Sequence, residues 1–213
     1  MRVLALSLAT LGLVATSAQA FPPKLPPVDE CSSEPGFSTF RQHLNDVVAR
    51  KDREALLAML APNVAVNFGG SEGPKAFAEA WGLDRAGESE IWPLLRKILG
   101  LGCAVSEEGF AIPSLTMQFE PEEDEDLFDK FVVISPAATL RSGPEPGSRP
   151  IGKLAWDVVK AVDQSRGAQT KVRLQDGREG WLSSAELYNP AYYRMFLRKR
   201  DGKWVIAAFI AGD

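Results

Sequence analysis

Histidine and cysteine are scarce in this 213-residue chain, which contains one histidine and two cysteines. His43 has no partner in the nearby sequence that identifies a general base, and a solvated histidine is the expected alternative. Because nitrogen and sulfur ligands are so few, we expect no metal site and no cofactor. No Ser-His-Asp or Cys-His set is visible either, so we expect a protein that is not an enzyme.

Long apolar segments are absent after residue 20, and so is a positive charge balance. The formal net charge is −4, which gives no general attraction to nucleic acid or to an anionic membrane. No later segment approaches the length of a membrane span. We therefore expect no nucleic-acid partner, and a mature protein that is not integral to a membrane.

The first twenty residues have the pattern of a cleaved export signal. Arg2 precedes an apolar run, and the run ends in the small residues around Gln19. We expect cleavage after Ala20 and a periplasmic or secreted mature chain that begins at Phe21; an uncleaved anchor is the alternative. Residues 21–35 begin with four prolines among seven residues, which favours an extended tether.

Cys31 and Cys103 are an even pair in a chain that carries an export signal. Such a pair indicates one disulfide. The alternative, a redox or nucleophilic thiol, lacks a Cys-x-x-Cys spacing and a local base.

Residues 36–119 have helical periodicity, with one short apolar strand around Val64–Phe68. The chain ends in two strand-like runs separated by Asp201-Gly202, a strong hairpin signal. We expect residues 36–119 and 190–213 to form one α+β domain. The order of helices, strand and closing hairpin is similar to the nuclear transport factor 2-like fold.

Residues 120–130 form an acidic connector between this helical part and the region that follows. Calcium could use its oxygens, but the glycine and terminal glutamate of a calcium-binding loop are missing. A solvated loop is the expected structure.

Residues 131–188 contain short apolar runs punctuated by turn residues, which is typical of a small antiparallel barrel. Leu140 to Pro144, Ile151 to Leu154 and Gly180-Trp181-Leu182 occur in an order that resembles a bacterial SH3-like domain. The fold class expected for the whole chain is therefore α+β, with a small β-barrel between the helical section and the terminal hairpin. The hairpin could pair with the barrel or with the Val64–Phe68 strand.

The resemblance implies a domain that binds cell-wall material or peptides. The chain departs from the family where Gly167-Ala168-Gln169-Thr170 replaces a large aromatic before Lys171. Six apolar residues are expected in the barrel core: Leu140, Ile151, Leu154, Val159, Val172 and Trp181. The candidate ligand contacts are Arg141, Trp156, Arg178, Glu179 and Tyr188.

The function that these features favour is an exported, non-catalytic protein that binds peptidoglycan or an envelope protein or peptide. One alternative is a small-molecule or catalytic pocket in the helical part, lined by Phe40, Phe68, Trp81, Trp92 and Phe209. Another is an inhibitor or assembly partner that offers only a rigid surface.

Overall fold

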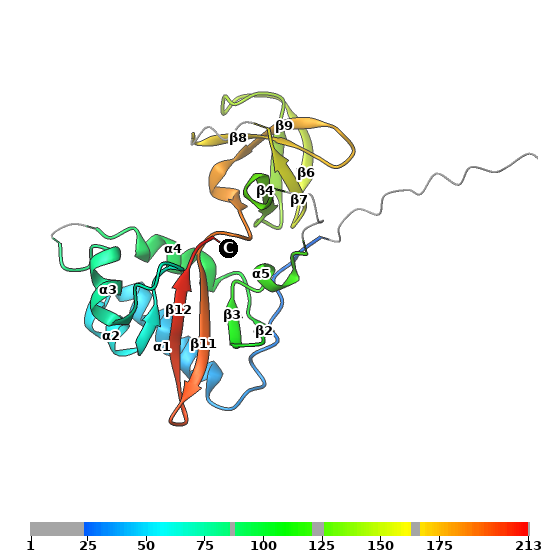
Figure 1. The fold of residues 1–213 in the computed structure, drawn as a ribbon. Helices are drawn as coiled ribbons and strands as arrows, with labels where there is room; N and C mark the ends of the chain where they lie inside the picture. Colours follow the sequence, from blue (N-terminus) through cyan, green and yellow to red (C-terminus); the bar gives the residue numbers. More distant parts are fainter. Residues whose placement is uncertain (1–23, 86–87, 121–125, 163–166, 213) are drawn as a thin grey trace, which may run out of the picture.

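The fold is α+β, as the sequence predicts. A computed structural model describes residues 24–85, 88–120, 126–162 and 167–212. The helical segments are α1 Phe37–Arg50, α2 Arg53–Ala58, α3 Gly73–Ala80, α4 Ile91–Leu99, α5 Leu115–Gln118 and the short 3-10 turns η1 Leu127–Asp129 and η2 Ser184–Glu186. The strands form two sheets, which lie one above the other in Figure 1.

The lower sheet has five strands in the order β1-β12-β11-β3-β2. Their bounds are β1 Leu60–Ala65, β2 Ala104–Ser106, β3 Gly109–Ile112, β11 Arg194–Arg200 and β12 Lys203–Ile210. Strands β11 and β12 form the terminal hairpin, and β12 continues into parallel pairing with β1. The hairpin thus pairs with the strand of the helical section, which lies at Leu60–Ala65 and not at the predicted Val64–Phe68.

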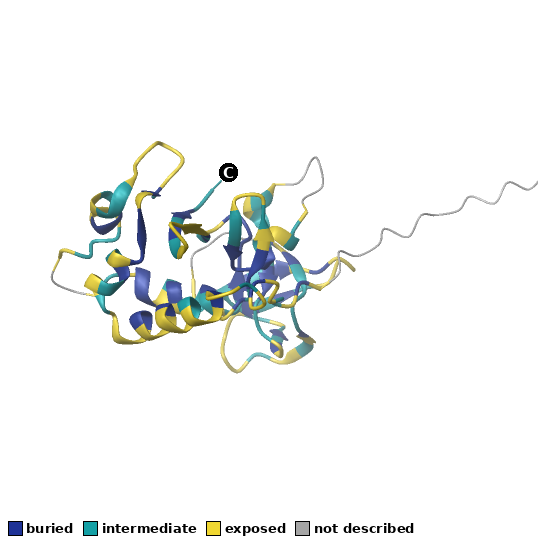
Figure 2. Ribbon diagram, turned by 90° about the horizontal axis from the view of Figure 1, so that it is seen from below, coloured by how far each residue is buried: buried dark blue, intermediate teal, exposed yellow. Residues whose placement is uncertain are grey.

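Helix α1 covers one face of this sheet. Its Phe37 is fully buried and makes edge contacts with Phe110 of β3 and Trp204 of β12, at centroid distances of 4.9 and 5.2 Å. Figure 1 shows α1 behind β11 and β12, and Figure 2 shows exposed residues on the helix surface that faces away from the sheet. The apolar residues of α1, which recur at helical spacing, are therefore buried against the inward-facing alternate residues of the strands.

The predicted disulfide is confirmed, because Cys31 and Cys103 are bonded and their Cα atoms lie 5.9 Å apart. The segment before α1 is also tied to the start of β2 by backbone hydrogen bonds. Cys103 N donates to Val28 O, and Glu30 N donates to Cys103 O. The bond thus fixes the N-terminal segment to an edge of the five-stranded sheet.

The upper sheet has seven strands in the order β10-β4-β7-β8-β9-β5-β6. Their bounds are β4 Lys130–Val133, β5 Ala138–Arg141, β6 Pro150–Leu154, β7 Val158–Ala161, β8 Gln169–Arg173, β9 Glu179–Ser183 and β10 Leu187–Tyr188. The predicted small barrel is not closed: β6 pairs with β5 and β10 with β4, and among the described residues the two end strands do not pair with each other. The chain leaves β10 directly toward β11, so β10 joins the two sheets.

The two sheets share one apolar core. Val132 and Tyr188, from the upper sheet, belong to the same buried cluster as Leu95 of α4 and Phe209 of β12. A second, smaller cluster lies inside the upper sheet and includes Leu140, Leu154, Val159, Val172 and Leu182. Lys97 Nζ also donates to Leu187 O at 3.1 Å across the junction. Packing and hydrogen bonds thus connect both sheets.

The predicted signal peptide, the first residues of the proline-rich tether and most of the acidic connector lie outside the described residues. Within the described ranges, no helix has the length and apolar character needed to cross a membrane.

Candidate ligand-binding face

Three side chains form a row on the outward face of the upper sheet. Trp181 of β9 lies opposite Arg141 of β5 on one side and opposite Lys171 of β8 on the other. Directly opposed residues in neighbouring antiparallel strands have Cβ atoms about 5 Å apart, so these side chains are close neighbours. The strand register therefore places Trp181 between two basic residues.

Alternation along β9 turns Trp181 outward. Gly180 and Leu182 are buried, whereas Glu179, Trp181 and Ser183 are half-buried. A Cβ at Gly180 would lie 2.7 Å from the Leu140 side chain, so only glycine lets β9 approach β5 this closely. The expectation that Trp181 lies in the core is wrong, because the side chains of Leu140 and Leu182 fill the inner side.

Arg141 is held in place by the loop that follows it. Its Nη1 donates to Ser148 O at 2.8 Å, and Ser142 N donates to Arg149 O at 3.0 Å, which closes the loop between β5 and β6. A guanidinium has five N–H donors, so other donors of Arg141 are available to a ligand. The loop therefore orients the cation beside the indole.

Glu179 lies one step along the same face. Its carboxylate accepts from Lys171 Nζ at 2.6 Å and from Arg173 Nη2 at 2.6 Å. The hydrogen bonds from Lys171 and then Arg173 lower the pKa of Glu179 below its ordinary value. One carboxylate thus pairs with two cations, Lys171 and Arg173, and with Arg141 this face keeps an excess of positive charge.

Arg178 lies in the exposed turn between β8 and β9, away from the Trp181 row. Its Nε pairs with Asp176 Oδ2 at 2.7 Å, and the turn is closed by Leu174 N donating to Arg178 O. Hydrogen bonds from the Arg178 backbone and side chain lower the pKa of Asp176. Arg178 is thus paired inside its own turn.

Trp156 and Tyr188, the other two candidate contacts, lie at the junction of the sheets. Trp156 is half-buried against the shared core, and its backbone binds Leu25 and Val133. Tyr188 is 2% exposed, and its hydroxyl donates to Tyr193 O at 2.5 Å. The structure therefore brings Arg141 and Glu179 together on one face, and places Trp156 and Tyr188 elsewhere.

In the described part of the chain, the aromatic residues proposed to line a pocket in the helical part differ in their surroundings. Trp81 and Phe209 pack on each other with centroids 5.3 Å apart, while Trp92 is buried and Phe68 is 57% exposed. The Trp81 and Phe209 rings are in contact with each other, so they leave no space for a ligand between them.

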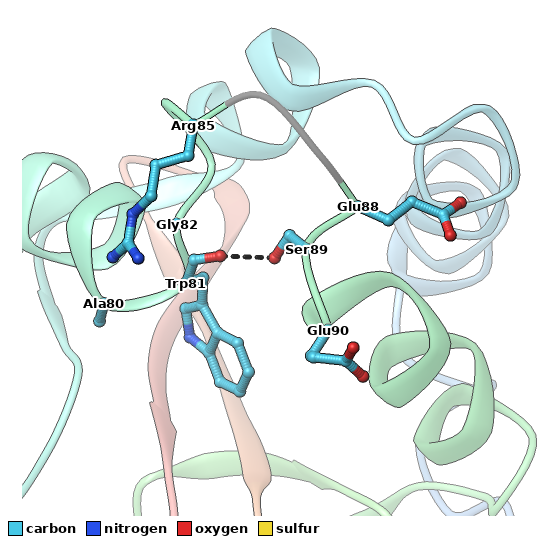
Figure 3. A pocket seen from close by; sticks show the side chains of 7 residues that line it. All are labelled: Ala80, Trp81, Gly82, Arg85, Glu88, Ser89 and Glu90. Carbon is cyan, nitrogen blue, oxygen red and sulfur yellow. Dashed lines mark hydrogen bonds between the residues drawn. The ribbon is translucent and has the colours of Figure 1, made fainter.

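A shallow cavity of about 380 Å³ lies beside Trp81. It is lined by Ala80, Trp81, Gly82, Arg85, Glu88, Ser89 and Glu90. Ser89 Oγ donates to Trp81 O at 2.5 Å, and Arg85 and Glu88 point away from each other (Figure 3). The cavity thus offers one indole and charges of both signs that do not converge.

His43 lies exposed on α1. Among the described residues, no three His, Cys, Asp or Glu side chains come together as a possible metal site.

Comparison with known proteins gives one weak structural match. No family model and no curated protein matches the chain. Among solved structures, a designed protein of the nuclear transport factor 2-like type is 16% identical, covers 83% of this chain and 96% of its own, and has a TM-score of 0.27. At that score the match only loosely agrees with the resemblance noted in the sequence, and we draw nothing further from it.

Proposed function

We propose that this protein is an exported, non-catalytic binding protein of the cell envelope. In this proposal the upper sheet is an SH3-like module, and its ligand is cell-wall peptidoglycan. The observation that carries the proposal is the outward row of Arg141, Trp181 and Lys171 on three adjacent strands.

The chemistry of the row suits a glycan that carries peptide carboxylates. The broad indole ring buries the apolar face of a sugar, and its N–H provides one donor. Arg141 and Lys171 lie on both sides of the ring, where they can pair with carboxylates, and a guanidinium does so with two parallel hydrogen bonds. Trp and Arg are also the residues that most often dominate binding energies at interfaces.

Export is supported by two independent features. The first twenty residues have the composition of a cleaved signal, and the disulfide between Cys31 and Cys103 is of the kind that persists in oxidising compartments. N-terminal sequencing of the protein recovered from the periplasm or medium should begin at Phe21. An N-terminus at Met1 would contradict export by this signal.

Sedimentation with purified peptidoglycan sacculi tests the binding proposal. The mature protein should sediment with sacculi, and Trp181→Ala should abolish most of that binding while its circular dichroism stays unchanged. Phe128→Ala is the matched control, because Phe128 is an aromatic residue that is 51% exposed outside this row.

A crude envelope extract would be run alongside. Equal sedimentation of the wild type and Trp181→Ala would contradict the proposed site. No sedimentation, with one protein recovered from the extract, would replace peptidoglycan with a peptide or protein partner. If the protein neither sedimented with sacculi nor recovered a protein from the extract, the cavity beside Trp81 would become the candidate binding site.

A further inference from the structure

The face of the five-stranded sheet opposite α1 carries a stripe of cations and one aromatic ring. Alternate residues of β11 lie on this face and form what we call the β11 stripe: Arg194, Phe196, Arg198 and Arg200. The Arg194 guanidinium lies 6.0 Å from the centre of the Phe196 ring, while Arg198 and Arg200 both donate to Asn63 Oδ1 at 3.4 Å. These shared contacts place all four side chains on the same side of the sheet.

The helices leave this side of the sheet open. The intervening residues Met195 and Leu197 point into the shared core with Ile206 and Phe209. In Figure 1 the strands β11 and β12 lie in front of α1, and no helix passes in front of them. The β11 stripe is thus on the uncovered surface of the sheet.

Positive charge is poorly compensated at the end of the stripe that carries Arg198 and Arg200. Within the described residues, no carboxylate forms an ion pair with Arg198, and Arg200 has only Asp201, whose Oδ2 lies 4.0 Å from its Nε. Lys203 is exposed directly opposite Arg200 on β12. In the part of the chain that the structure describes, Glu107 and Glu108, in the turn between β2 and β3, form no ion pair with Arg198 or Arg200. A chain of net charge −4 thus concentrates cations on this face.

Apolar surface accompanies the charges. Phe68 is 57% exposed, and the Arg194 guanidinium lies 5.7 Å from the centre of its ring. Phe196 is half-buried between Arg194 and Arg198, and Val205 is half-buried opposite Arg198. A ligand that offered only negative charge would leave these side chains uncovered.

We propose that the β11 stripe is a docking surface for an extended acidic peptide segment of a partner protein. Residues two apart in an extended chain are about 6.7 Å apart, which is the spacing of the β11 side chains themselves. A strand-like segment with acidic residues at alternate positions and one apolar residue among them therefore matches Arg194, Phe196, Arg198 and Arg200 in order. Complementary charge and register together specify this occupant.

A second copy of the chain is a poorer occupant. A two-fold interface places the same patch on both subunits, so the arginines of one stripe would face those of the other. Like charges at such an interface are unfavourable. The acidic segment avoids this repulsion.

Titration calorimetry with two short synthetic peptides of the same composition tests the proposal. In one, glutamate and serine alternate around a single leucine; in the other, all glutamates are contiguous. The mature protein should bind the alternating peptide about tenfold more tightly than the contiguous one. The double variant Arg198→Gln/Arg200→Gln should weaken the alternating peptide by about tenfold.

Arg50→Gln/Lys75→Gln is the matched control, because it removes two exposed cations from helices α1 and α3, outside both proposed binding surfaces, and it should leave peptide affinity unchanged. Equal affinity for both peptides, or equal loss in both double variants, would overturn the proposal in favour of a nonspecific charge effect. Self-association that disappears in Arg198→Gln/Arg200→Gln would overturn it in favour of a second copy. Sedimentation of Arg198→Gln/Arg200→Gln with sacculi tests the peptidoglycan proposal separately, because this variant leaves the row around Trp181 intact.

Discussion

Tyr188 shows how one residue joins the two sheets. Its ring belongs to the shared core, its backbone pairs with β4, and its hydroxyl donates to Tyr193 O. Burial raises the pKa of Tyr188 above its ordinary value of 10.0, the nearby Arg194 opposes the shift, and Tyr192 adds to it. The pKa of the neighbouring Lys97 is lowered by burial.

Tyr188→Phe should lower the free energy of unfolding by about 1 kcal/mol near neutral pH, because a buried hydrogen bond is lost. The folded pKa of Tyr188 is raised, so its contribution to stability is complete below pH 10.0 and is lost as the pH rises above that value. The difference between wild type and variant should therefore shrink at alkaline pH.

Urea denaturation at a neutral and an alkaline pH measures this difference. A gap that stays constant or widens with rising pH would show that Tyr188 ionises as easily in the folded protein as in the unfolded chain.

Trp181 shows where sequence reasoning about single residues fails. Both Trp181 and Leu182 are apolar, so the sequence alone does not say which one faces inward. Gly180 could have indicated the inward side of the strand, because a strand glycine often marks a close approach of neighbouring backbone and Leu182 lies on the same side as Gly180. Arg141 and Glu179 were predicted as ligand contacts and lie in or beside the row, whereas the pairing that brings Lys171 to Trp181 depends on strand register.

The terminal hairpin is the element that the sequence predicts best. Asp201 and Gly202 both have positive φ, 50° and 76°, as the Asp-Gly signal implies for a tight turn. Gly202→Ala should cost roughly 1–2 kcal/mol of stability, because a Cβ disfavours the left-handed conformation even though the surrounding space is open.

Gly147→Ala is the control for this variant. Gly147 also has open space around it and does not have a positive φ, so its replacement should be nearly neutral in thermal denaturation. Equal melting temperatures for the two variants would contradict the claim that the positive φ of Gly202 makes its replacement costly.

The disulfide constrains the segment that leads into α1. It closes a loop with a sequence separation of 72 residues. In the chain-entropy description, a loop of this length contributes about 4 kcal/mol. The double variant Cys31→Ser/Cys103→Ser should therefore lose about that much free energy of unfolding in guanidinium titrations. A loss below about 1 kcal/mol would mean that the unfolded chain is already constrained.

The architecture of the whole molecule was only partly predictable. Periodicity and turn residues predict the α+β class and the hairpin, because both depend on local patterns. The end strand β10 contains Tyr188, whose side chain lies in the shared core, and the chain continues from β10 into β11 of the other sheet. Such long-range packing has no local signature.

The shared core also limits which deletion variants can be used to test binding. Val132 is fully buried in the cluster that contains Phe209 of β12. Deleting the region between Val132 and Leu187 would remove part of the core of the remaining protein. Single substitutions on the outward face are therefore cleaner tests of binding than deletions.

Hydrogen exchange of the mature protein, with and without soluble peptidoglycan fragments, tests the central claim most directly. Our account predicts that protection upon binding is concentrated in β5, β8 and β9, around Arg141, Trp181 and Lys171. Protection confined to the surroundings of Trp81, or to β11, with no change in these three strands, would contradict it.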